Sequence, residues 1–416
     1  MSSFWRIFSL ESTSLIRSGT FALLAATGVL WTVLSPLLLE GDGTAEGARE
    51  LYVRYSIGGV FALLLVALVS SATGALARER AAKRLQLTMV RPVRYFTIAA
   101  AKIAAISCVG AVVLALSMAL AILKTGTGNE CNHVLRPLMP SPREEALAMY
   151  EHFMASDETP IQVKRTKKEI VLRLLENRAR DNYQTIATNS TAQWTFDLKE
   201  ELDSPKVRFK FSTDFNQRQN VSGRVSIGRW SSSVSNITQT VVTVPLVYGE
   251  GKDDAVMRFS NGADGFVMLR PRRDIALLVP ADSFLMNLFR AYLELVAILT
   301  LVVSFGVFLG SCLSRPVALF TAIVVLIVSE ISPSVVEQYP DQLETDKVDR
   351  IALSFTRFAS AATRPVSSLS PLQSLSQDEC VEVGEVVFVV AINMFLLPAA
   401  MALFSAFFVP RKQDES

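Results

Sequence analysis

Long blocks of apolar residues alternate with polar stretches along this chain, and the pattern predicts a helical membrane protein. About 20 consecutive apolar residues carry a helix across roughly 30 Å of hydrocarbon. We expect six spans, at about residues 19–39, 57–77, 99–123, 288–313, 316–328 and 386–409. The fifth block is short, so it is either a complete crossing or a re-entrant helix. No small-x-small cleavage site follows the first block, and we therefore expect it to remain in the protein.

The first eighteen residues mix aromatic and aliphatic side chains with Arg6, Ser9 and Glu11. This pattern suits a helix lying in the membrane interface, with Trp5 at the depth of the lipid headgroups. An ordinary tail before the first span would show a similar pattern, so both interpretations stay open.

A polar stretch between the third and fourth blocks predicts a separate α+β domain at residues 125–287. Two amphipathic helical patterns open it, SPREEALAMYEHFMAS from Ser141 and KRTKKEIVLRLLENRARDNY from Lys164. The hydrophobic period then changes from 3.6 to 2. The expected strands lie in WTFDL, KVRFKFSTDF, NVSGRVSIGRW, ITQTVVTVPLVYG, AVMRFS and DIALLVPA. Short strands separated by turn residues favour a small β-sandwich.

The predicted organisation therefore has three parts. Residues 1–124 hold an interfacial helix and three transmembrane helices, and residues 125–287 form the inserted domain. Residues 288–416 hold the last three transmembrane helices, with a further polar segment at about 333–384.

Charge sets the expected orientation of these parts. Half of the residues are hydrophobic and 19% are charged, whereas soluble proteins carry about a quarter charged residues. The stretch from Ala77 to Lys102 holds seven basic residues and one acid, Glu79. Short loops rich in Lys and Arg stay in the cytoplasm. Six spans with both termini in the cytoplasm, and with residues 125–287 and 333–384 outside, satisfy this rule at every loop.

The sequence contains no recognisable catalytic or metal-binding motif. The glycine-rich KTGTGNE lacks the spacing of a phosphate-binding loop, and neither histidine lies in an HExxH arrangement. We therefore expect no enzyme activity and no cofactor or metal in this chain, and nothing points to nucleic acid as a partner.

The four cysteines fall into two pairs. Cys131 and Cys380 lie at the edges of the predicted extracytoplasmic material, where they either form a disulfide or remain unpaired thiols. Cys108 and Cys312 lie within predicted spans, where we expect them to pack as small apolar residues.

The fourth block carries two further signals. Gly306 and Gly310 form a GxxxG pattern that permits close helix packing, either within the chain or across a dimer. Arg290 precedes Glu294 by one helical turn and could pair with it. Because the apolar run begins just after them, we place Arg290 and Glu294 among the lipid headgroups.

The basic stretch resembles the cytoplasmic loop between the second and third spans of permease subunits of ATP-binding-cassette (ABC) transporters, in the type-2 exporter family. The matching positions are Glu79, Leu85, Gln86, Leu87, Met89, Pro92, Val93 and Lys102. The family's Gly-Thr is replaced by Lys83-Arg84, and many members carry their largest external segment elsewhere.

The resemblance implies a permease that works as a dimer, with a second copy or a paralogue, in the inner membrane of a bacterium. Loop 78–98 would then couple to a separate ATPase subunit that binds ATP. The coupling residues it implies are Glu79, Arg80, Lys83, Arg84, Leu85, Leu87, Met89 and Pro92. A simpler interpretation of the loop is a positive-inside anchor with no docking role.

A different class of function also fits the residues. The chain could be a non-transporting membrane protein whose extracytoplasmic β-domain senses or binds a ligand or a partner protein. Six spans exceed what an anchor needs, and the large external domain exceeds what a permease needs. A secondary transporter is disfavoured because no span shows an obvious cluster of ionisable residues at mid-depth.

Overall fold

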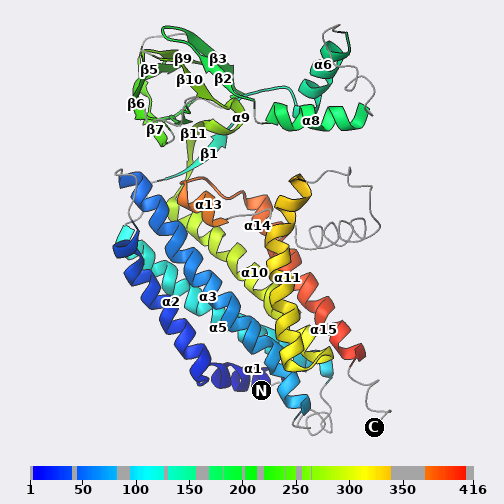
Figure 1. Ribbon diagram of the computed structural model, residues 1–416. Coiled ribbons are helices and arrows are strands. Elements are labelled where there is room, and N and C mark those ends of the chain that lie inside the picture. The colour runs from blue at the N-terminus through cyan, green and yellow to red at the C-terminus, as the bar shows by residue number, and fades with distance from the viewer. Residues whose placement is uncertain are drawn as a thin grey trace. The chain divides into compact units, whose positions relative to one another are not determined.

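The computed structural model describes residues 3–39, 45–81, 94–125, 130–155, 168–180, 182–198, 202–212, 220–238, 240–249, 255–263, 265–338 and 371–408 (Figure 1). The chain divides into two compact units. Unit 1 contains Met1–Asn129 and Ser283–Ser416, and unit 2 contains Glu130–Asp282. The predicted domain at 125–287 extends a few residues beyond unit 2 at each end.

Unit 1 is a bundle of mostly long apolar helices. In chain order they are α1 (Ser3–Ile16), α2 (Gly19–Leu38), α3 (Ala45–Ala81), α5 (Tyr95–Thr125), α10 (Phe284–Cys312), α11 (Arg315–Gln338), α13 (Pro371–Ser376), α14 (Val383–Val390), the π-helix η1 (Ala391–Leu396) and α15 (Leu397–Phe408).

Among the described residues, five helical stretches are long and apolar enough to cross a membrane. They are α2, α3, α5, α10 and the continuous run of α14, η1 and α15. The apolar part of α11, Arg315–Val328, is shorter, as the short fifth block predicted. These helices are those of a polytopic membrane protein.

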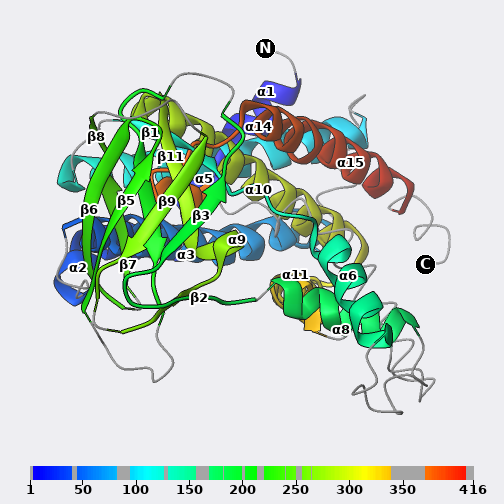
Figure 2. The same cartoon turned by 90° about the horizontal axis from the view of Figure 1, so that it is seen from above.

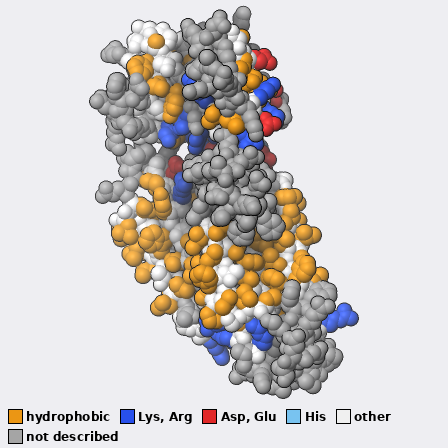
Figure 3. All heavy atoms as spheres, turned by 45° about the vertical axis from the view of Figure 1, so that its right-hand side comes forward, with side chains coloured by type: hydrophobic (Ala, Val, Ile, Leu, Met, Phe, Trp, Pro, Cys, Tyr) orange, Lys and Arg blue, Asp and Glu red, His pale blue; other side chains and the backbone are white. Residues whose placement is uncertain are grey.

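Helix α10 lies at the centre of unit 1, where it packs against α3, α5, α11 and α15 (Figure 1). Most of its residues from Ala291 to Ser311 are buried. Helix α2, in contrast, leaves Leu23, Leu30 and Leu37 exposed. Figure 3 shows hydrophobic side chains over much of the visible surface of the helices. Apolar residues on the outside are expected of helices whose solvent is lipid.

In its described residues, unit 2 combines three helices with three antiparallel sheets. Its elements are β1 (Cys131–Leu135), α6 (Pro142–Ala155), α8 (Lys168–Arg180), β2 (Gln184–Ile186), β3 (Thr191–Thr195), β4 (Lys206–Lys210), β5 (Asn220–Ile227), β6 (Trp230–Ile237), β7 (Val241–Pro245), β8 (Val247–Tyr248), β9 (Val256–Asn261), β10 (Val267–Leu269), α9 (Pro271–Asp274) and β11 (Ile275–Asp282). The strand orders are β1-β11-β4-β7, β3-β9-β5-β6-β8 and β10-β2. Figure 2 shows β6, β5, β9 and β3 side by side.

One aromatic core joins the two larger sheets. Phe209 of β4 and the adjoining Phe211 have ring centroids 5.6 and 5.2 Å from that of Phe259 on β9. All three side chains are buried, so the four-stranded and five-stranded sheets face each other across them. This is the packing of a β-sandwich.

Helices α6 and α8 of unit 2 pack as a pair, and α6 begins at the predicted N-cap, Ser141. The backbone N–H of Glu144 donates to Ser141 Oγ at 3.2 Å, and the backbone N–H of Ser141 donates to Glu144 Oε2 at 2.7 Å. This reciprocal capping box satisfies donors that the first turn of α6 leaves open. The same hydrogen bonds lower the pKa of the Glu144 carboxyl below its ordinary value. Helix α8 buries Val171 and Leu175 in its contact with α6.

Candidate functional site

Lys102 of α5 is the centre of a buried group of charges in unit 1. Its Nζ lies 2.6 Å from Glu11 Oε2 on α1 and 2.9 Å from Glu79 Oε1 on α3. Lys102 is 2% exposed, whereas the side chains of Glu11 and Glu79 are 14% and 30% exposed. An ammonium group buried this deeply needs nearby counter-charges and hydrogen-bond acceptors. We call these three residues the charge cluster.

The charge cluster explains why α1 is held against the bundle. Glu11 and Leu15 lie one turn apart, and Leu15 is buried in the core of unit 1. Trp5 and Leu10 are more than half exposed. Helix α1 therefore turns one face to the bundle and leaves large apolar side chains on its other surface. The sequence left a helix and an ordinary tail open, and the structure has a helix.

Arg80, the next residue after Glu79, contacts a different helix. Its Nη1 donates to the backbone oxygen of Ser311 at 2.5 Å, and its Nη2 donates to that of Leu313 at 2.6 Å. A cation at the last carbonyls of a helix satisfies open acceptors and complements the helix dipole. Two consecutive residues at the end of α3 thus connect it to α5 and to α10.

The sequence had assigned Glu79 and Arg80 to the coupling loop, together with Lys83, Arg84, Leu85, Leu87, Met89 and Pro92. These last six lie outside the described residues, which resume at Arg94. The expected coupling role of the loop stays a prediction.

The glycines of α10 allow a close approach to α3 within the chain. A Cβ at Gly306 would lie 2.8 Å from the Cβ of Ala72, and a Cβ at Gly310 would collide with the carbonyl oxygen of Thr73. Of the two alternatives that the sequence left open, the described contacts are those of packing inside one chain.

The cysteines divide as follows. Cys131 and Cys380 are disulfide-bonded, and Cys108 and Cys312 are free thiols. That Cys131 and Cys380 bond to each other stays a prediction. Cys108 is exposed on α5, so the expectation that it packs inside the protein is wrong. An exposed thiol on an apolar helix is compatible with a lipid-facing surface.

Glu294 lies in the interior of unit 1. It is 1% exposed, and its Oε1 has no hydrogen-bond partner among the described residues. Protein atoms surround this side chain, since α10 packs against other helices on several sides. The prediction that Glu294 lies among the lipid headgroups is therefore wrong. Arg290 donates a hydrogen bond to the backbone oxygen of Val381 at 3.4 Å.

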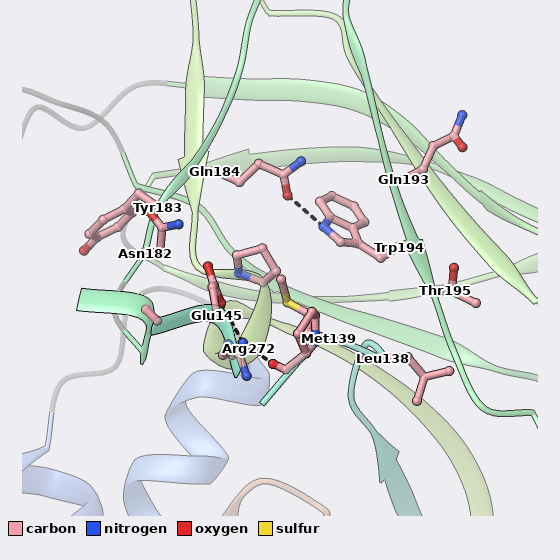
Figure 4. A pocket seen from close by; sticks show the side chains of 13 residues that line it. Leu138, Met139, Glu145, Asn182, Tyr183, Gln184, Gln193, Trp194, Thr195 and Arg272 are labelled. Atoms are coloured by element: carbon pink, nitrogen blue, oxygen red, sulfur yellow. Dashed lines mark hydrogen bonds and ion pairs between the residues drawn. The ribbon is translucent and has the colours of Figure 1, made fainter. Parts of the chain in front are cut away.

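Unit 2 contains a half-open pocket of about 470 Å³ (Figure 4). Its lining comes from six separate stretches of the chain: Leu138, Met139, Pro140, Glu145, Ala179, Asn182, Tyr183, Gln184, Gln193, Trp194, Thr195, Pro271 and Arg272. Trp194 Nε1 donates to Gln184 Oε1 at 2.9 Å, and Arg272 Nη2 contacts Glu145 Oε2 at 2.8 Å. Sequence reasoning missed this pocket, since no local motif joins these residues.

In the described part of the chain, no group of three or more His, Cys, Asp and Glu residues could hold a metal ion. Comparisons with known proteins assign no family: no family model, no curated protein and no solved structure matches this chain.

Proposed function

We propose that this chain is the membrane-spanning permease subunit of an ATP-driven exporter of the ABC type-2 class. Loop 78–98 and both termini lie in the cytoplasm of a bacterium, and unit 2 lies outside the inner membrane. A separate ATPase subunit binds ATP and docks on the loop. A second permease copy or a paralogue completes the transport pathway, and this chain catalyses no reaction itself.

One observation carries the proposal: the described ends of the predicted coupling loop are fastened to the rest of the bundle. Glu79, at the start of loop 78–98, and Lys102, just after its end, are ion-paired, and Glu11 adds α1 to the same cluster. Arg80 binds the last carbonyls of α10. A subunit that pushes on the loop would thus move four helices together.

The physical reason is that packed, hydrogen-bonded elements move as bodies, whereas a loose loop would absorb the displacement. An anchor loop needs only its positive charge to stay in the cytoplasm. An anchor loop has no need of a buried lysine paired with two carboxylates at its base, and the presence of this charge cluster favours a coupling role.

The test is purification of the full chain from native membranes, with identification of co-purifying proteins and an ATP hydrolysis assay. We expect a stoichiometric ATPase that is lost when Leu87→Asp places a charge among the apolar residues Leu85, Leu87 and Met89 of the loop sequence. The matched control is Val247→Asp, because Val247 is 66% exposed on unit 2 and lies far along the chain from the loop. This variant should retain the ATPase.

Two outcomes would contradict the proposal. One is a pure chain without any ATPase, which would favour a non-transporting membrane protein whose β-domain does the work. The other is an ATPase that stays bound to Leu87→Asp as well as to Val247→Asp.

A further inference from the structure

The pocket of unit 2 borders the free edge of a β-sheet. Strand β3 is the first strand in its sheet, and among the described strands it pairs only with β9. Three consecutive residues of β3, Gln193, Trp194 and Thr195, line the pocket (Figure 4). The pocket is therefore bounded in part by backbone as well as by side chains.

The hydrogen-bond alternation of β3 shows which backbone groups face away from β9. The N–H of Phe196 donates to Ala255, and the N–H of Asn261 donates to the oxygen of Ser190. Residues of β3 bond to β9 at every second position. Gln193 lies between these positions, so its N–H and C=O point to the free edge, and no described residue pairs with them.

This edge already pairs with another part of the chain at one position. The backbone N–H of Leu138, in the link between β1 and α6, donates to the oxygen of Thr195 at 2.8 Å. The link continues along the pocket through Met139 and Pro140 and enters α6, which begins at Pro142. The edge beside Gln193 is left without a neighbouring strand from the described chain.

The side chains around the edge favour an uncharged ligand. Glu145 and Arg272 form an ion pair with each other. Each charge is therefore neutralised within the protein, and neither requires a charged ligand. Leu138 and Met139 are 59% and 37% exposed and give the pocket an apolar wall. The indole N–H of Trp194 is already bonded to Gln184.

We propose that the pocket of unit 2 binds a peptide segment in extended conformation, with uncharged side chains, by adding a short strand to β3. The N–H and C=O of Gln193 supply the main-chain hydrogen bonds. Leu138 and Met139 contact an apolar side chain of the peptide. Strand addition with side-chain pockets beside the edge is an established mode of peptide recognition. The volume lies in the usual range for ligand sites, about 300–1,000 Å³. This inference does not depend on the proposed transport role.

The experiment uses the full chain in lipid nanodiscs and a pool of blocked hexapeptides composed of uncharged residues. Bound peptides are identified by mass spectrometry, and the best binder is titrated. Gln193→Pro removes the free N–H at a place where an edge strand tolerates proline. Loss of this main-chain bond and of its geometry should weaken binding about tenfold. The matched control Gln193→Ala keeps the backbone and should bind within about twofold of the unchanged chain.

A second variant does not alter the strand. Met139→Glu puts an uncompensated charge in the apolar wall and should also weaken binding about tenfold, because the carboxylate loses water when the peptide enters. N-methylation of the peptide residue opposite Gln193 should have the same effect while leaving the protein unchanged.

Several results would overturn the inference. The first is that no peptide in the pool is enriched on the unchanged chain over Met139→Glu. The second is that Gln193→Ala loses as much affinity as Gln193→Pro, since the side-chain amide and not the backbone would then recognise the ligand. The third is that maltose or cellobiose displaces the bound peptide while the N-methylated peptide binds normally, which would identify a saccharide site.

Discussion

The charge cluster makes a quantitative prediction about the stability of unit 1. The perturbation is the replacement of Glu11 and Glu79 by methionine, first separately and then together. Methionine has a similar length but no charge and no strong acceptor. A third step adds Lys102→Met to the double variant and removes the last charge.

The expected magnitudes follow from exposure and distance. Glu11→Met leaves Lys102 paired with Glu79 and should cost about 1–2 kcal/mol. Glu79 is 30% exposed, so water screens its contact, and Glu79→Met should cost less than about 1 kcal/mol. The double variant leaves an ammonium group at 2% exposure without a counter-charge, and such a change costs about 3–5 kcal/mol. The triple variant should return to within about 1 kcal/mol of the unchanged protein.

The assay is unfolding of the full chain in mixed micelles by titration with sodium dodecyl sulfate, with free energies from linear extrapolation. The decisive comparison is between the double and the triple variants. If the double variant costs no more than the two single changes together, Lys102 is not held by two carboxylates. If the triple variant is no more stable than the double, burial of an unpaired charge is not the cause of the loss.

Three other predictions concern separate features. Gly310→Ala forces α10 away from α3 and should lower the free energy of unfolding by about 1–3 kcal/mol in the same titration. Gly384→Ala, which has no atom within 4 Å of the new Cβ, should show no such loss, and equal effects would refute the packing argument. Ser141→Ala removes the cap of α6 and should cost about 1 kcal/mol, seen as faster hydrogen exchange in that helix alone. Peptide mapping without reductant should find Cys131 joined to Cys380, and free thiols at both positions would contradict the predicted bond.

Most of unit 1 was predictable because its signals are local and long. A helix that crosses a membrane needs a run of apolar residues, and each run is visible without knowledge of its neighbours. The same holds for the cap at Ser141 and for the alternation in strands such as β5 and β9. Strand β1 was missed because it is short and is defined by pairing with β11, which is distant in the sequence.

The charge cluster shows where sequence reasoning stopped. Glu79 was noticed as a lone acid, and Lys102 was counted among the basic residues of the loop. Their pairing, and the participation of Glu11, join positions 23 and 91 residues apart. Nothing in one sequence reveals such contacts. One signal was available: Lys102 lies a few residues inside the apolar block of the third span, not before it. A lysine in that position needs a counter-charge from another helix.

The central position of α10 has a consequence for how the membrane unit is assembled during synthesis. The chain of unit 1 is interrupted by all of Glu130–Asp282, so α10 emerges after the β-domain has been made. At elongation rates of about 5–20 residues per second, this delay lasts roughly 8–30 s. Until then the small-residue surface of α3 around Ala72 and Thr73 lacks its partner helix. During this delay, lipid or the insertion machinery must cover that surface. The time needed to synthesise the β-domain therefore sets the earliest moment at which α10 can pack against α3.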